Sequence, residues 1–582
     1  MRSLLSSSFN GFSAKAMVTL ALSVVLHFEL MAASMAPVRS NQFMVVSAQH
    51  LASKVGVQIL KKGGNSVDAA VAVAYALAVV YPAAGNLGGG GFMTLKFQNG
   101  VETFLDFREK APLAASPDMF LGPGGEVVDQ LSTRGHLAVG VPGTVAGLEY
   151  ARKKFGTMSR KALMEPAIEL AQRGFVLETG DVEMLEVATE DFKKDSEAAK
   201  VFLRNGQALK VGDRLVQSLL AKTLRRIQAR GEEDFYKGKT ARLMANASQA
   251  GGGILTQSDF EQYQAREMKP IDCNYRGYRI LSAPPPSSGG VTICEILKLL
   301  EAYPLRAWGF HSAKSLQVQI EAMRRAYVDR NTQLGDPAFH NNPIEFLLSQ
   351  SHIDEWRKSI VPGRSTPSSE LMPASFSQEG ESTTHFSIVD RIGNAVSMTY
   401  TLNDWFGARV MAKGTGVLLN NEMDDFTIKL GALNHYQLLQ GRVNQIQPSK
   451  RPLSSMSPTI VLKDDQVVMV LGTPGGSRII TAVLQTLINT IDYDMTLQEA
   501  VDAPRFHHQW IPDVVFYEEF AIPPDALEQL QAWGYTFKPS RLANHLAAIM
   551  VGGPRLSQLK PSSHVYFGAN DPRRNTGLAI GQ

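Results

Sequence analysis

Two alternating segments, residues 383–390 and 394–401, constrain the fold of this 582-residue chain more than any other feature. The loop between them, Arg391-Ile392-Gly393, has three residues and ends in glycine, which is typical of a β-hairpin. Because side chains alternate between the two faces of a strand, each segment offers one apolar face and one polar face. The segments therefore predict an antiparallel hairpin with its apolar face in a hydrophobic core.

The register of this hairpin follows from its loop. If Asp390 pairs with Asn394, Thr383 lies opposite Thr401, so two hydroxyl groups meet at the open end of the hairpin. The apolar face then carries five side chains, those of Phe386, Ile388, Val396, Met398 and Tyr400. Threonine pairs are common across strands, so the pairing alone favours a catalytic role and plain sheet structure about equally.

Thr383 follows a stretch without periodicity, residues 362–382, which is rich in serine and proline and predicts a loop. A threonine hydroxyl is a weak nucleophile unless a base lies beside it, and a free α-amine on the same residue can serve as that base. The ordinary pKa of such an amine is roughly 7.7–8.0. The amine is free only after a cut between Ser382 and Thr383, so a nucleophilic Thr383 predicts that cut.

Composition and charge exclude several kinds of partner. The chain has 58 basic and 55 acidic residues and a formal net charge of +3, which is too balanced to indicate binding to nucleic acid or to an anionic membrane. Its two cysteines, Cys273 and Cys294, exclude a disulfide framework and an all-cysteine metal site. Two buried free thiols are favoured over a single bridge.

The first 36 residues have the order of a secretory signal peptide. Arg2 and Lys15 precede the apolar run 16–26, and small residues follow at 32–36. The run is shorter than a bilayer-spanning helix, so export with cleavage is favoured over a membrane anchor. The mature protein is expected to be periplasmic or secreted, without a membrane segment.

Periodicity divides the remainder into a helix-rich part and a strand-rich part. Helices are predicted over 44–62, 67–80, most of 145–250, 291–302, further segments up to about residue 360, and 477–491. Besides the hairpin, strands are predicted over 92–97, 102–107, 416–419, 459–462, 467–472, 547–551 and 565–568. Helices that precede two groups of strands favour layered α+β architecture over a doubly wound sheet.

Three further segments carry groups suited to binding or catalysis. Residues 420–425 present consecutive acids after a strand, and residues 451–458 form a turn rich in hydroxyl groups. Residues 472–478 lead from a strand into a helix and include Gly475-Gly476, whose N–H groups at a helix N-terminus suit an oxyanion. Each segment taken alone is best explained as a turn or a cap, so only their combination indicates a site.

Two other kinds of site are not favoured. Residues 231–240 end in Gly-Lys-Thr, but a phosphate-binding P-loop requires glycine where Glu233 stands. His507 and His508 are adjacent, so their side chains point apart and a packed or hydrogen-bonded pair is favoured over metal ligands. No cofactor and no metal are therefore expected.

Motifs along nearly the whole chain together resemble the γ-glutamyltransferase family of N-terminal nucleophile hydrolases. They lie at 85–93, 106–109, 142–147, 284–290, 383–385, 420–426, 451–458, 474–478 and 504–510. The resemblance extends from about Val38 to Arg573, and residues 575–582 match poorly. It implies a four-layer αββα sandwich built from both products of self-cleavage. These products would be a helix-rich large subunit, 37–382, and a strand-rich catalytic small subunit, 383–582, paired as a heterodimer.

The resemblance also implies the catalytic roles. Thr383 would attack the carbonyl carbon of Ser382 to cut the chain, and would then attack a γ-glutamyl carbonyl to form an ester. Thr401 would orient and activate the Thr383 hydroxyl, while Gly475 and Gly476 would hold the oxyanion. The segment 430–442 would form a lid, with Tyr436 reaching Asn403.

The implied substrate has an ammonium and a carboxylate on one carbon atom, and charged residues match both. The groups expected at the α-ammonium are Asn403, Glu422 and Asp425, although other family members carry glutamine at the position of Glu422. The groups expected at the α-carboxylate are Arg108, Ser454 and Ser455, because arginine offers a bidentate fork. Taken alone, Arg108 would instead be explained by a structural ion pair with Asp106 or Glu109.

The implied substrates are glutathione and other γ-glutamyl compounds, with water, amino acids or dipeptides as acceptors. The nearest alternative is a cephalosporin (glutaryl) acylase of the same fold. A dicarboxylic side chain lacks an ammonium, so the acid at Asp425 and the Ser454-Ser455 pair favour the glutamyl substrate. A non-catalytic relative or a periplasmic solute-binding protein is the alternative from another class, and it would show no self-cleavage.

Overall fold

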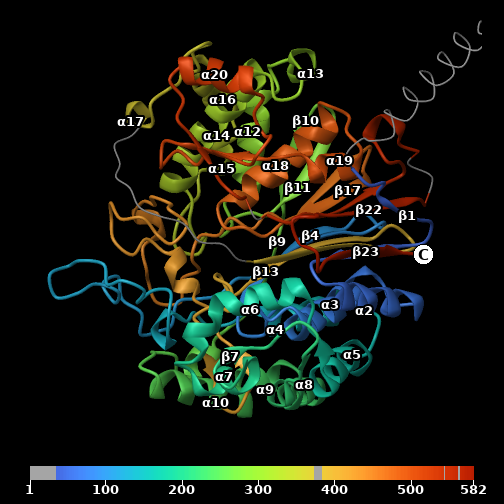
Figure 1. Cartoon of the computed structure of the whole chain (residues 1–582), viewed down its shortest axis with the longest axis vertical. Coiled ribbons are helices and arrows are strands. Elements are labelled where there is room, and N and C mark those ends of the chain that lie inside the picture. Colours follow the sequence, from blue (N-terminus) through green and yellow to red (C-terminus); the bar gives the residue numbers. More distant parts are fainter. Residues whose placement is uncertain (1–33, 372–382, 543, 561–563) are drawn as a thin grey trace, which may run out of the picture. The chain divides into compact units, whose positions relative to one another are not determined.

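Two seven-stranded antiparallel sheets lie at the centre of the computed structural model, which describes residues 34–371, 383–542, 544–560 and 564–582 (Figure 1). The predicted signal peptide, 1–36, falls almost entirely outside the described residues. No helix within these ranges is long and apolar enough to span a membrane.

The predicted hairpin forms the middle of the first sheet, in which Thr384 pairs with Tyr400 and Val389 with Ala395. The predicted register is therefore confirmed. In spatial order the strands are β23 (Leu578–Gly581), β2 (Met44–Ser47), β12 (Thr384–Val389), β13 (Ala395–Thr401), β3 (Gly90–Lys96), β4 (Glu102–Phe107) and β9 (Arg266–Met268).

The second sheet packs face to face on the first. In spatial order its strands are β1 (Val38–Ser40), β22 (Tyr566–Asn570), β21 (Ala547–Val551), β17 (Gln466–Gly472), β16 (Thr459–Lys463), β11 (Tyr278–Ser282) and β10 (Ile271–Tyr275). Apolar side chains between the sheets, such as Val46 and Ile549, form a core of their own, and Ser397 donates a hydrogen bond to the carbonyl of Leu471 across the interface.

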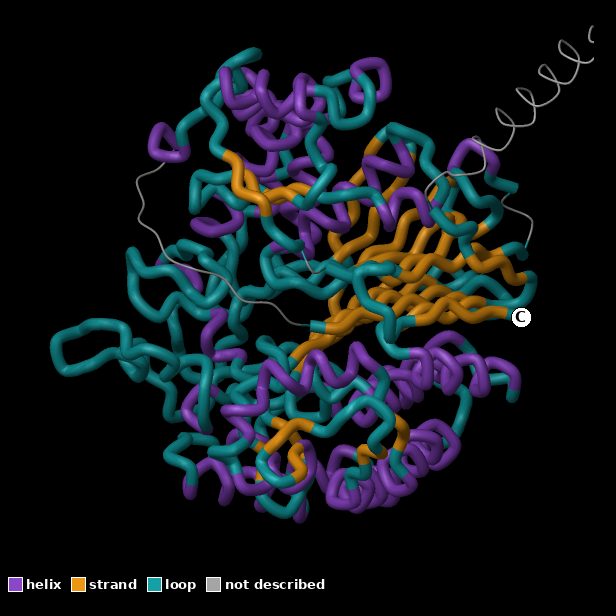
Figure 2. Tube along the Cα trace, viewed as in Figure 1, coloured by secondary structure: helices purple, strands orange, loops and turns teal. Residues whose placement is uncertain are grey.

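Helices cover the outer face of each sheet and complete four layers (Figure 2). On the outer side of the first sheet, packed on it or on one another, lie α2 (His50–Lys61), α3 (Ser66–Val80), α4 (Thr144–Phe155), α5 (Arg160–Arg173), α6 (Thr179–Phe192), α7 (Ser196–Phe202), α8 (Ser218–Arg230), α9 (Glu232–Tyr236), α10 (Lys239–Ala250) and α11 (Gln257–Glu261). Against the second lie α12 (Gly289–Leu300), α13 (Leu305–Trp308), α14 (Ala313–Gln333), α15 (Ile344–Leu347), α16 (Gln350–Lys358), α18 (Arg478–Ile491), α19 (Leu497–Asp502) and α20 (Pro524–Ala532).

The remaining elements are short. They are α17 (Ser368–Leu371), the strands β5 (Phe175–Val176), β6 (Leu203–Arg204), β7 (Gln207–Ala208), β8 (Arg214–Leu215), β14 (Met411–Ala412), β15 (Val417–Leu418), β18 (Phe506–His507), β19 (Val515–Tyr517) and β20 (Phe537–Pro539), and the 3-10 turns η1 (His136–Ala138), η2 (Glu422–Asp425), η3 (Arg442–Asn444) and η4 (Leu556–Gln558).

The apolar helix predicted at 67–80 is α3, and every one of its residues is buried. Asn65 and Asp68 form a capping box at its start: the side chain of Asn65 accepts from the N–H of Asp68, while the Asp68 carboxylate accepts from the N–H of Asn65. The cap satisfies the first N–H groups where water cannot reach them, so this helix can lie under the first sheet.

Three predictions of local structure are wrong. The helix expected over 44–62 begins only at His50, because Met44–Ser47 pairs as β2 between β12 and β23. The strands β9, β10 and β11 fall in a region without a predicted strand, and α17 interrupts the loop expected over 362–382. For β2 and β9, pairing with strands distant in sequence overrides the local pattern, whereas β10 and β11 pair with each other across Arg276-Gly277, a local hairpin that was not predicted.

The expectation of two free thiols is also wrong. Cys273 in β10 and Cys294 in α12 form a disulfide, with their Cα atoms 6.0 Å apart. Because α12 packs on the outer face of β10, the two side chains meet although 21 residues separate them in sequence. The bridge fastens one helix of the outer layer to the edge of its sheet.

Candidate active site

The open end of the hairpin borders a small cavity of about 20 Å³, and ten of the eleven described residues predicted for the site line it. These are Arg108, Thr383, Thr401, Asn403, Glu422, Asp425, Tyr436, Ser454, Ser455 and Gly476. Gly475 is not part of the wall, and Ser382 lies outside the described residues. Segments from five regions of the chain therefore converge as the sequence motifs imply.

The hydroxyl groups of Thr383 and Thr401 are in contact. Thr383 Oγ1 donates to Thr401 Oγ1 over 3.3 Å, and the backbone N–H of Asn403 donates to the same oxygen over 2.7 Å. Thr383 has a φ of 128°, which a β-branched residue rarely adopts. The arrangement places one hydroxyl as an acceptor beside the other, as the hairpin register requires.

The glycine-rich segment 85–91 contacts the backbone of Thr401. Asn86 Nδ2 donates to the carbonyl of Thr401 over 2.8 Å, and Asn86 Oδ1 accepts from the N–H of Gly89 over 3.0 Å. A Cβ atom on Gly89 would lie 1.9 Å from that same carbonyl oxygen. Only glycine allows this close approach, so the motif fixes the backbone of the threonine opposite Thr383.

Arg108 forms ion pairs with the acidic residues that were expected to bind the other end of the substrate. Its guanidinium contacts the carboxylates of Glu422 and Asp425 directly, and Glu109 lies 3.6 Å away. Its Nε also donates to the carbonyl of Pro452 over 3.3 Å. The groups expected at the two charged ends of a substrate thus pair with each other, because buried opposite charges in reach of each other do so.

Three buried carboxyl groups share this one guanidinium. Burial raises the pKa of Glu109 to about 7, and burial together with its acidic neighbours also raises the pKa of Glu422. Burial alone would lower the pKa of Arg108, but the carboxylates of Glu422 and Asp425 outweigh it and hold that pKa above its ordinary value. The cluster therefore retains a proton near neutral pH, which reduces its excess of negative charge.

The serine pair rests on a second turn. The N–H and hydroxyl of Ser288 both donate to the carbonyl of Ser454, over 2.8 and 2.7 Å, and the N–H of Ser454 donates to the carbonyl of Pro286 over 2.8 Å. The motif at 284–290 thus positions the serines. Ser455 accepts through its hydroxyl from a residue that the motifs did not include, Arg330.

Arg330 is a second buried guanidinium on the wall of the cavity. It donates to the hydroxyls of Ser288 and Ser455 over 3.0 and 2.9 Å, and to Asn331 Oδ1 over 2.8 Å. Burial lowers its pKa to about 10. Arg330 lies within the long helix α14, where helical periodicity predicts only packing, so no local pattern could have identified it.

Gly475 and Gly476 lie directly before α18, where the helix N-terminus favours negative charge. Their φ angles are 128° and 55°. Cβ atoms here would lie 2.1 Å from Asn544 Nδ2 and 2.4 Å from Tyr436 Cδ1, respectively. Asn544 also donates to the carbonyl of Pro474 over 2.5 Å, so it braces a turn that only glycine can form.

The predicted lid contributes Tyr436 and Leu438 to the wall of the cavity. Tyr436 donates through its hydroxyl to the carbonyl of Asn403 over 2.8 Å, as the resemblance implies. The neighbouring acids differ in use: Asp425 contacts Arg108, whereas Asp424 accepts from the backbone N–H of His435 over 2.9 Å. One acid of the pair thus faces the cavity and the other secures the lid.

The two adjacent histidines are buried and hydrogen-bonded, as expected. His507 contacts Thr481 Oγ1 and Gln509 Oε1, both at 2.8 Å, while His508 contacts Asp513 at 3.3 Å. Burial lowers the pKa of His507 to about 3 and that of His508 to about 4, so both rings are neutral. They support the core beneath α18.

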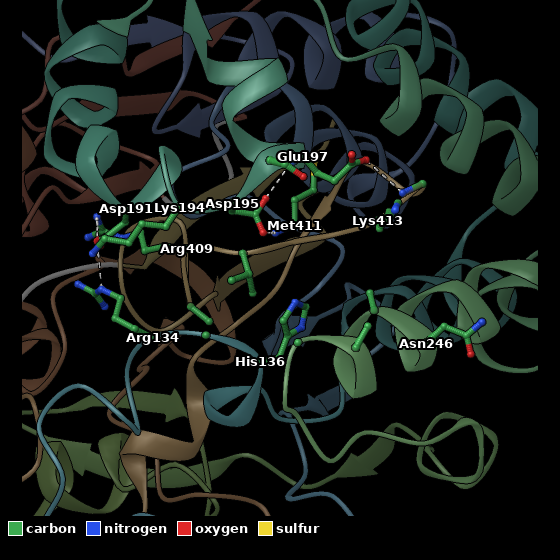
Figure 3. A pocket seen from close by; sticks show the side chains of 18 of the residues that line it. Arg134, His136, Asp191, Lys194, Asp195, Glu197, Asn246, Arg409, Met411 and Lys413 are labelled. Carbon is green, nitrogen blue, oxygen red and sulfur yellow. Dashed lines mark hydrogen bonds and ion pairs between the residues drawn. The ribbon is translucent and has the colours of Figure 1, made fainter. Parts of the chain in front are cut away.

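A much larger cavity, about 970 Å³, lies between η1, α7, α10 and β14 (Figure 3). Its charged residues are largely paired with one another. Arg134 contacts Asp191 at 3.3 Å and Asp404 at 2.9 Å, and Lys194 contacts Asp191 at 3.2 Å. It contains no arrangement comparable to the two threonine hydroxyls, so the smaller cavity is the candidate active site.

Known proteins support this assignment. The sequence model of the gamma-glutamyltranspeptidase family matches residues 52–581, which includes most of the C-terminal segment where the motifs match poorly. A glutathione hydrolase proenzyme from Pseudomonas sp. strain A14 is 58% identical over 568 residues, or 97% of this chain and 99% of the relative.

Solved structures agree with the fold. The crystal structure of a cephalosporin acylase from Bacillus halodurans matches with a TM-score of 0.81 at 26% identity, covering 95% of this chain and 98% of its own. A chain of the Helicobacter pylori gamma-glutamyltranspeptidase structure matches with a TM-score of 0.56 at 42% identity, covering 59% of this chain and 96% of its own. The four-layer α+β sandwich is thus that of the N-terminal nucleophile hydrolases, and this chain belongs to the gamma-glutamyltranspeptidase family.

Proposed function

We propose that this protein is a self-processing γ-glutamyltransferase that moves the glutamyl group of glutathione and related compounds to water, amino acids or dipeptides. The contact between the hydroxyls of Thr383 and Thr401 carries the proposal, because it lies in a cavity that also holds a guanidinium facing acids. The 58% identity to a glutathione hydrolase proenzyme supports the same activity.

Thr383 is the nucleophile of this reaction. Once it is N-terminal, its α-amine accepts the proton of its own hydroxyl, and Oγ1 attacks the γ-glutamyl carbonyl carbon. Thr401 holds Oγ1 in line, and the N–H groups of Gly475 and Gly476 stabilise the oxyanion. The amine of the departing fragment takes up the proton, leaving a glutamyl ester on Thr383, which water or an acceptor amine then cleaves.

Substrate binding rearranges the charges around Arg108. The α-carboxylate of the substrate binds the guanidinium of Arg108 and accepts hydrogen bonds from the hydroxyls of Ser454 and Ser455. The α-ammonium binds the carboxylates of Asp425 and Glu422 and the side chain of Asn403. The internal contacts between Arg108 and the acids are replaced by two contacts with the substrate, so charge stays balanced without water. Tyr436 covers the bound glutamyl group from the lid.

Processing uses the same hydroxyl. Thr383 Oγ1 attacks the carbonyl carbon of Ser382, the peptide bond shifts to an ester, and water releases the carboxylate of Ser382 and the amine of Thr383. The products, residues 37–382 and 383–582, stay together because β12 and β13 lie between β2 and β3 in one sheet. The Helicobacter pylori chain, which matches 59% of this sequence, is consistent with a large subunit of that size.

We further propose that residues 1–36 direct export and are removed, which places the enzyme in the periplasm or outside the cell. The charged, apolar and small-residue order of this segment supports export.

The Thr383→Ala variant tests the nucleophile. We expect a single full-length chain on a denaturing gel and no release of aniline from a γ-glutamyl anilide, whereas the wild-type protein gives two chains, the smaller beginning at Thr383. Thr384→Val is the matched control, because the buried Thr384 hydroxyl has no hydrogen-bond partner among the described residues and valine has the same shape. Activity in the alanine variant would refute the role of Thr383.

A glutaryl acylase is the second candidate, since an acylase structure shares the fold. A γ-glutamyl anilide and a glutaryl anilide differ only in the α-amino group. The acids Glu422 and Asp425 should make kcat/KM for the glutamyl compound about 100-fold higher or more, because the other substrate leaves buried charges unpaired. A preference for the glutaryl compound would favour the acylase.

A further inference from the structure

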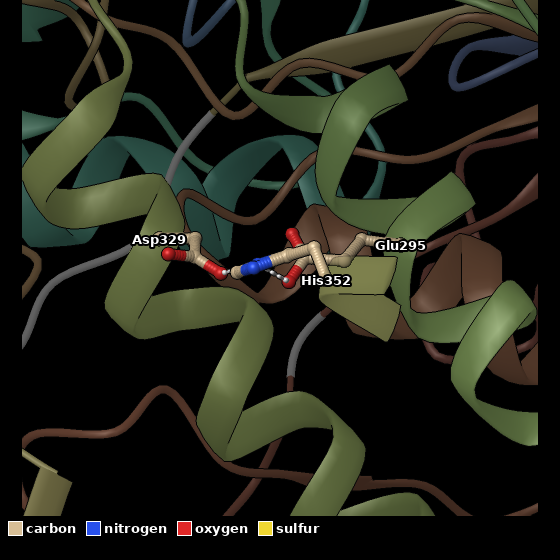
Figure 4. Close-up of side chains that lie close together, drawn as sticks. All are labelled: Glu295, Asp329 and His352. Atoms are coloured by element: carbon tan, nitrogen blue, oxygen red, sulfur yellow. Dashed lines mark hydrogen bonds and ion pairs between the residues drawn. The ribbon is translucent and has the colours of Figure 1, made fainter. Parts of the chain in front are cut away.

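Three helices of the outer layer bring together a carboxyl, a carboxylate and an imidazole far from the hairpin in sequence. The residues are Glu295 in α12, Asp329 in α14 and His352 in α16, and Figure 4 shows their side chains converging on one point. One ligand atom from each lies within 4.8 Å of the others. Their exposed fractions are 1%, 5% and 8%.

Within the described part of the chain, neither carboxyl group of this cluster forms an ion pair with a lysine or an arginine. Among the described residues, the ion-pair contacts of Glu295 and Asp329 are with His352 alone, at 3.9 and 2.8 Å. The buried Glu295 Oε1 has no hydrogen-bond partner within the described part of the chain. Two carboxyl groups held this close in a buried setting require either a shared proton or a cation.

We propose that Glu295, Asp329 and His352 bind a divalent transition-metal cation of the zinc type. Nitrogen and carboxylate oxygen are ligands that Zn²⁺ accepts, whereas Ca²⁺ and Mg²⁺ prefer six or more oxygens. Three protein ligands leave a fourth position for water.

The separations suit this coordination. A tetrahedral site with bonds of about 2.0–2.1 Å has ligand atoms about 3.3 Å apart. His352 Nε2 is 2.8 Å from Asp329 Oδ2 and 3.9 Å from Glu295 Oε1, so changes of about 0.6 Å or less would bring these two separations to the tetrahedral value, and the carboxyl oxygens of Glu295 and Asp329 lie within 4.8 Å of each other. Trp356 Nε1 donates to Asp329 Oδ2 over 2.7 Å, the kind of outer contact that orients a ligating carboxylate.

A cation here would join α12, α14 and α16. Two of these helices also support the serine turn of the active site, since Ser288 directly precedes α12 and Arg330 follows Asp329 in α14. Arg330 and the cluster residues do not share a ligand or a hydrogen bond, so the cation is expected to stabilise the helical layer rather than to take part in the transfer reaction.

The test uses the processed protein after dialysis against a chelator. We expect isothermal titration with Zn²⁺ to saturate at one ion per chain and the thermal midpoint to rise by several degrees, with hydrolysis of a γ-glutamyl anilide unchanged within about twofold. Glu295→Gln and His352→Gln should lose both effects. His340→Gln is the matched control, because His340 lies outside the cluster and contacts the carbonyl of Gln333 instead.

A measurement without variants guards against loss of folding. Co²⁺ bound to the wild-type protein should give the visible absorption of a four-coordinate site, and Zn²⁺ should abolish it. Failure of the wild-type protein to bind either ion, or equal binding by Glu295→Gln, would overturn the proposal. If neither ion binds, and the thermal midpoint depends on pH in the wild type but not in Glu295→Gln, a proton shared by Glu295 and Asp329 balances their charge instead.

Discussion

Two cavities of this protein can be compared: one is large and its charged groups are paired, and the other is small and its charged groups are crowded. The cavity lined by Arg134 holds about 970 Å³, and that arginine has two acids as partners, Asp191 and Asp404. The cavity at Thr383 holds about 20 Å³, yet three carboxyl groups there share the guanidinium of Arg108. Function in this fold is therefore indicated by converging groups whose charges are incompletely balanced, not by empty volume.

Among the tests of this comparison, the largest effect is expected at the turn that we propose holds the oxyanion. In Gly475→Ala the new Cβ would lie 2.1 Å from Asn544 Nδ2 at a φ of 128°, so the turn must shift. Loss of one oxyanion donor lowers kcat by about 100- to 1,000-fold. Steady-state kinetics with a γ-glutamyl anilide measure this effect.

The larger cavity offers a matched glycine. Gly414 has a φ of 77°, but a Cβ there would approach nothing closer than 3.9 Å. Gly414→Ala should therefore lose some stability and keep kcat. Equal losses of kcat in the two variants would show that the distinction between the cavities does not concern catalysis.

A smaller effect is expected from Arg108→Lys. A lysine keeps the charge but loses the bidentate fork, and one charge-assisted hydrogen bond of about 1.5–3 kcal/mol corresponds to roughly a 10- to 100-fold loss in kcat/KM. Chain cutting should continue, because the role proposed for Arg108 is to bind the substrate, and its side chain contacts Pro452, Glu422 and Asp425. Arg134→Lys in the larger cavity is the control and should change kcat/KM little, since lysine can still pair with Asp404.

The sequence predicted the hairpin correctly because its period and its loop are local properties. A three-residue loop and an alternating pattern leave one register, and this register placed Thr401 opposite Thr383. The prediction of the buried helix α3 also rested on a local pattern, since fourteen consecutive residues from Val67 to Val80 include a single charged side chain. The residues of the candidate site were predicted from motifs that are continuous stretches of sequence and resemble those of the γ-glutamyltransferase family.

Apart from the hairpin of β10 and β11, the features that were missed depend on partners far away in the chain. Met44–Ser47 is too short to reveal strand periodicity and becomes β2 only by pairing with β12 and β23. Arg330 reaches the site from within α14 and Asn544 from the loop before β21, where local patterns do not indicate a site. The Cys273–Cys294 bridge required knowing that α12 covers β10. Tertiary contacts of this kind leave no trace in a single sequence.

The third test uses pH. The folded protein holds the pKa of Glu109 near 7, above its ordinary value of 4.5, because the carboxyl is buried. Between these values the unfolded chain releases a proton that the folded protein retains, so stability falls as pH rises, by at most about 1.4 kcal/mol per pH unit for one proton. Glu109→Gln lacks this loss, so its thermal midpoint relative to wild type should rise from pH 5 to pH 8.

Glu197 on the wall of the larger cavity is the matched carboxyl for this test. Its hydrogen bond with Lys200 lowers its pKa, so its contribution to stability is present above the ordinary carboxyl pKa and is lost only in more acidic solution. The midpoint of Glu197→Gln relative to wild type should therefore stay constant over the same range. A rise in both variants would show that the pH effect does not come from the acid cluster at Arg108.

The smallest effect is expected from reversing a charge in the larger cavity. Lys413 is exposed on the wall of the larger cavity, where its charge helps to lower the pKa of Glu197. Lys413→Glu should change both kcat and KM for a γ-glutamyl anilide by less than about twofold, as exposed substitutions away from a site do. A large change in KM for the acceptor alone would mean that acceptors approach through this cavity, and the division between a catalytic and a non-catalytic cavity would have to be abandoned.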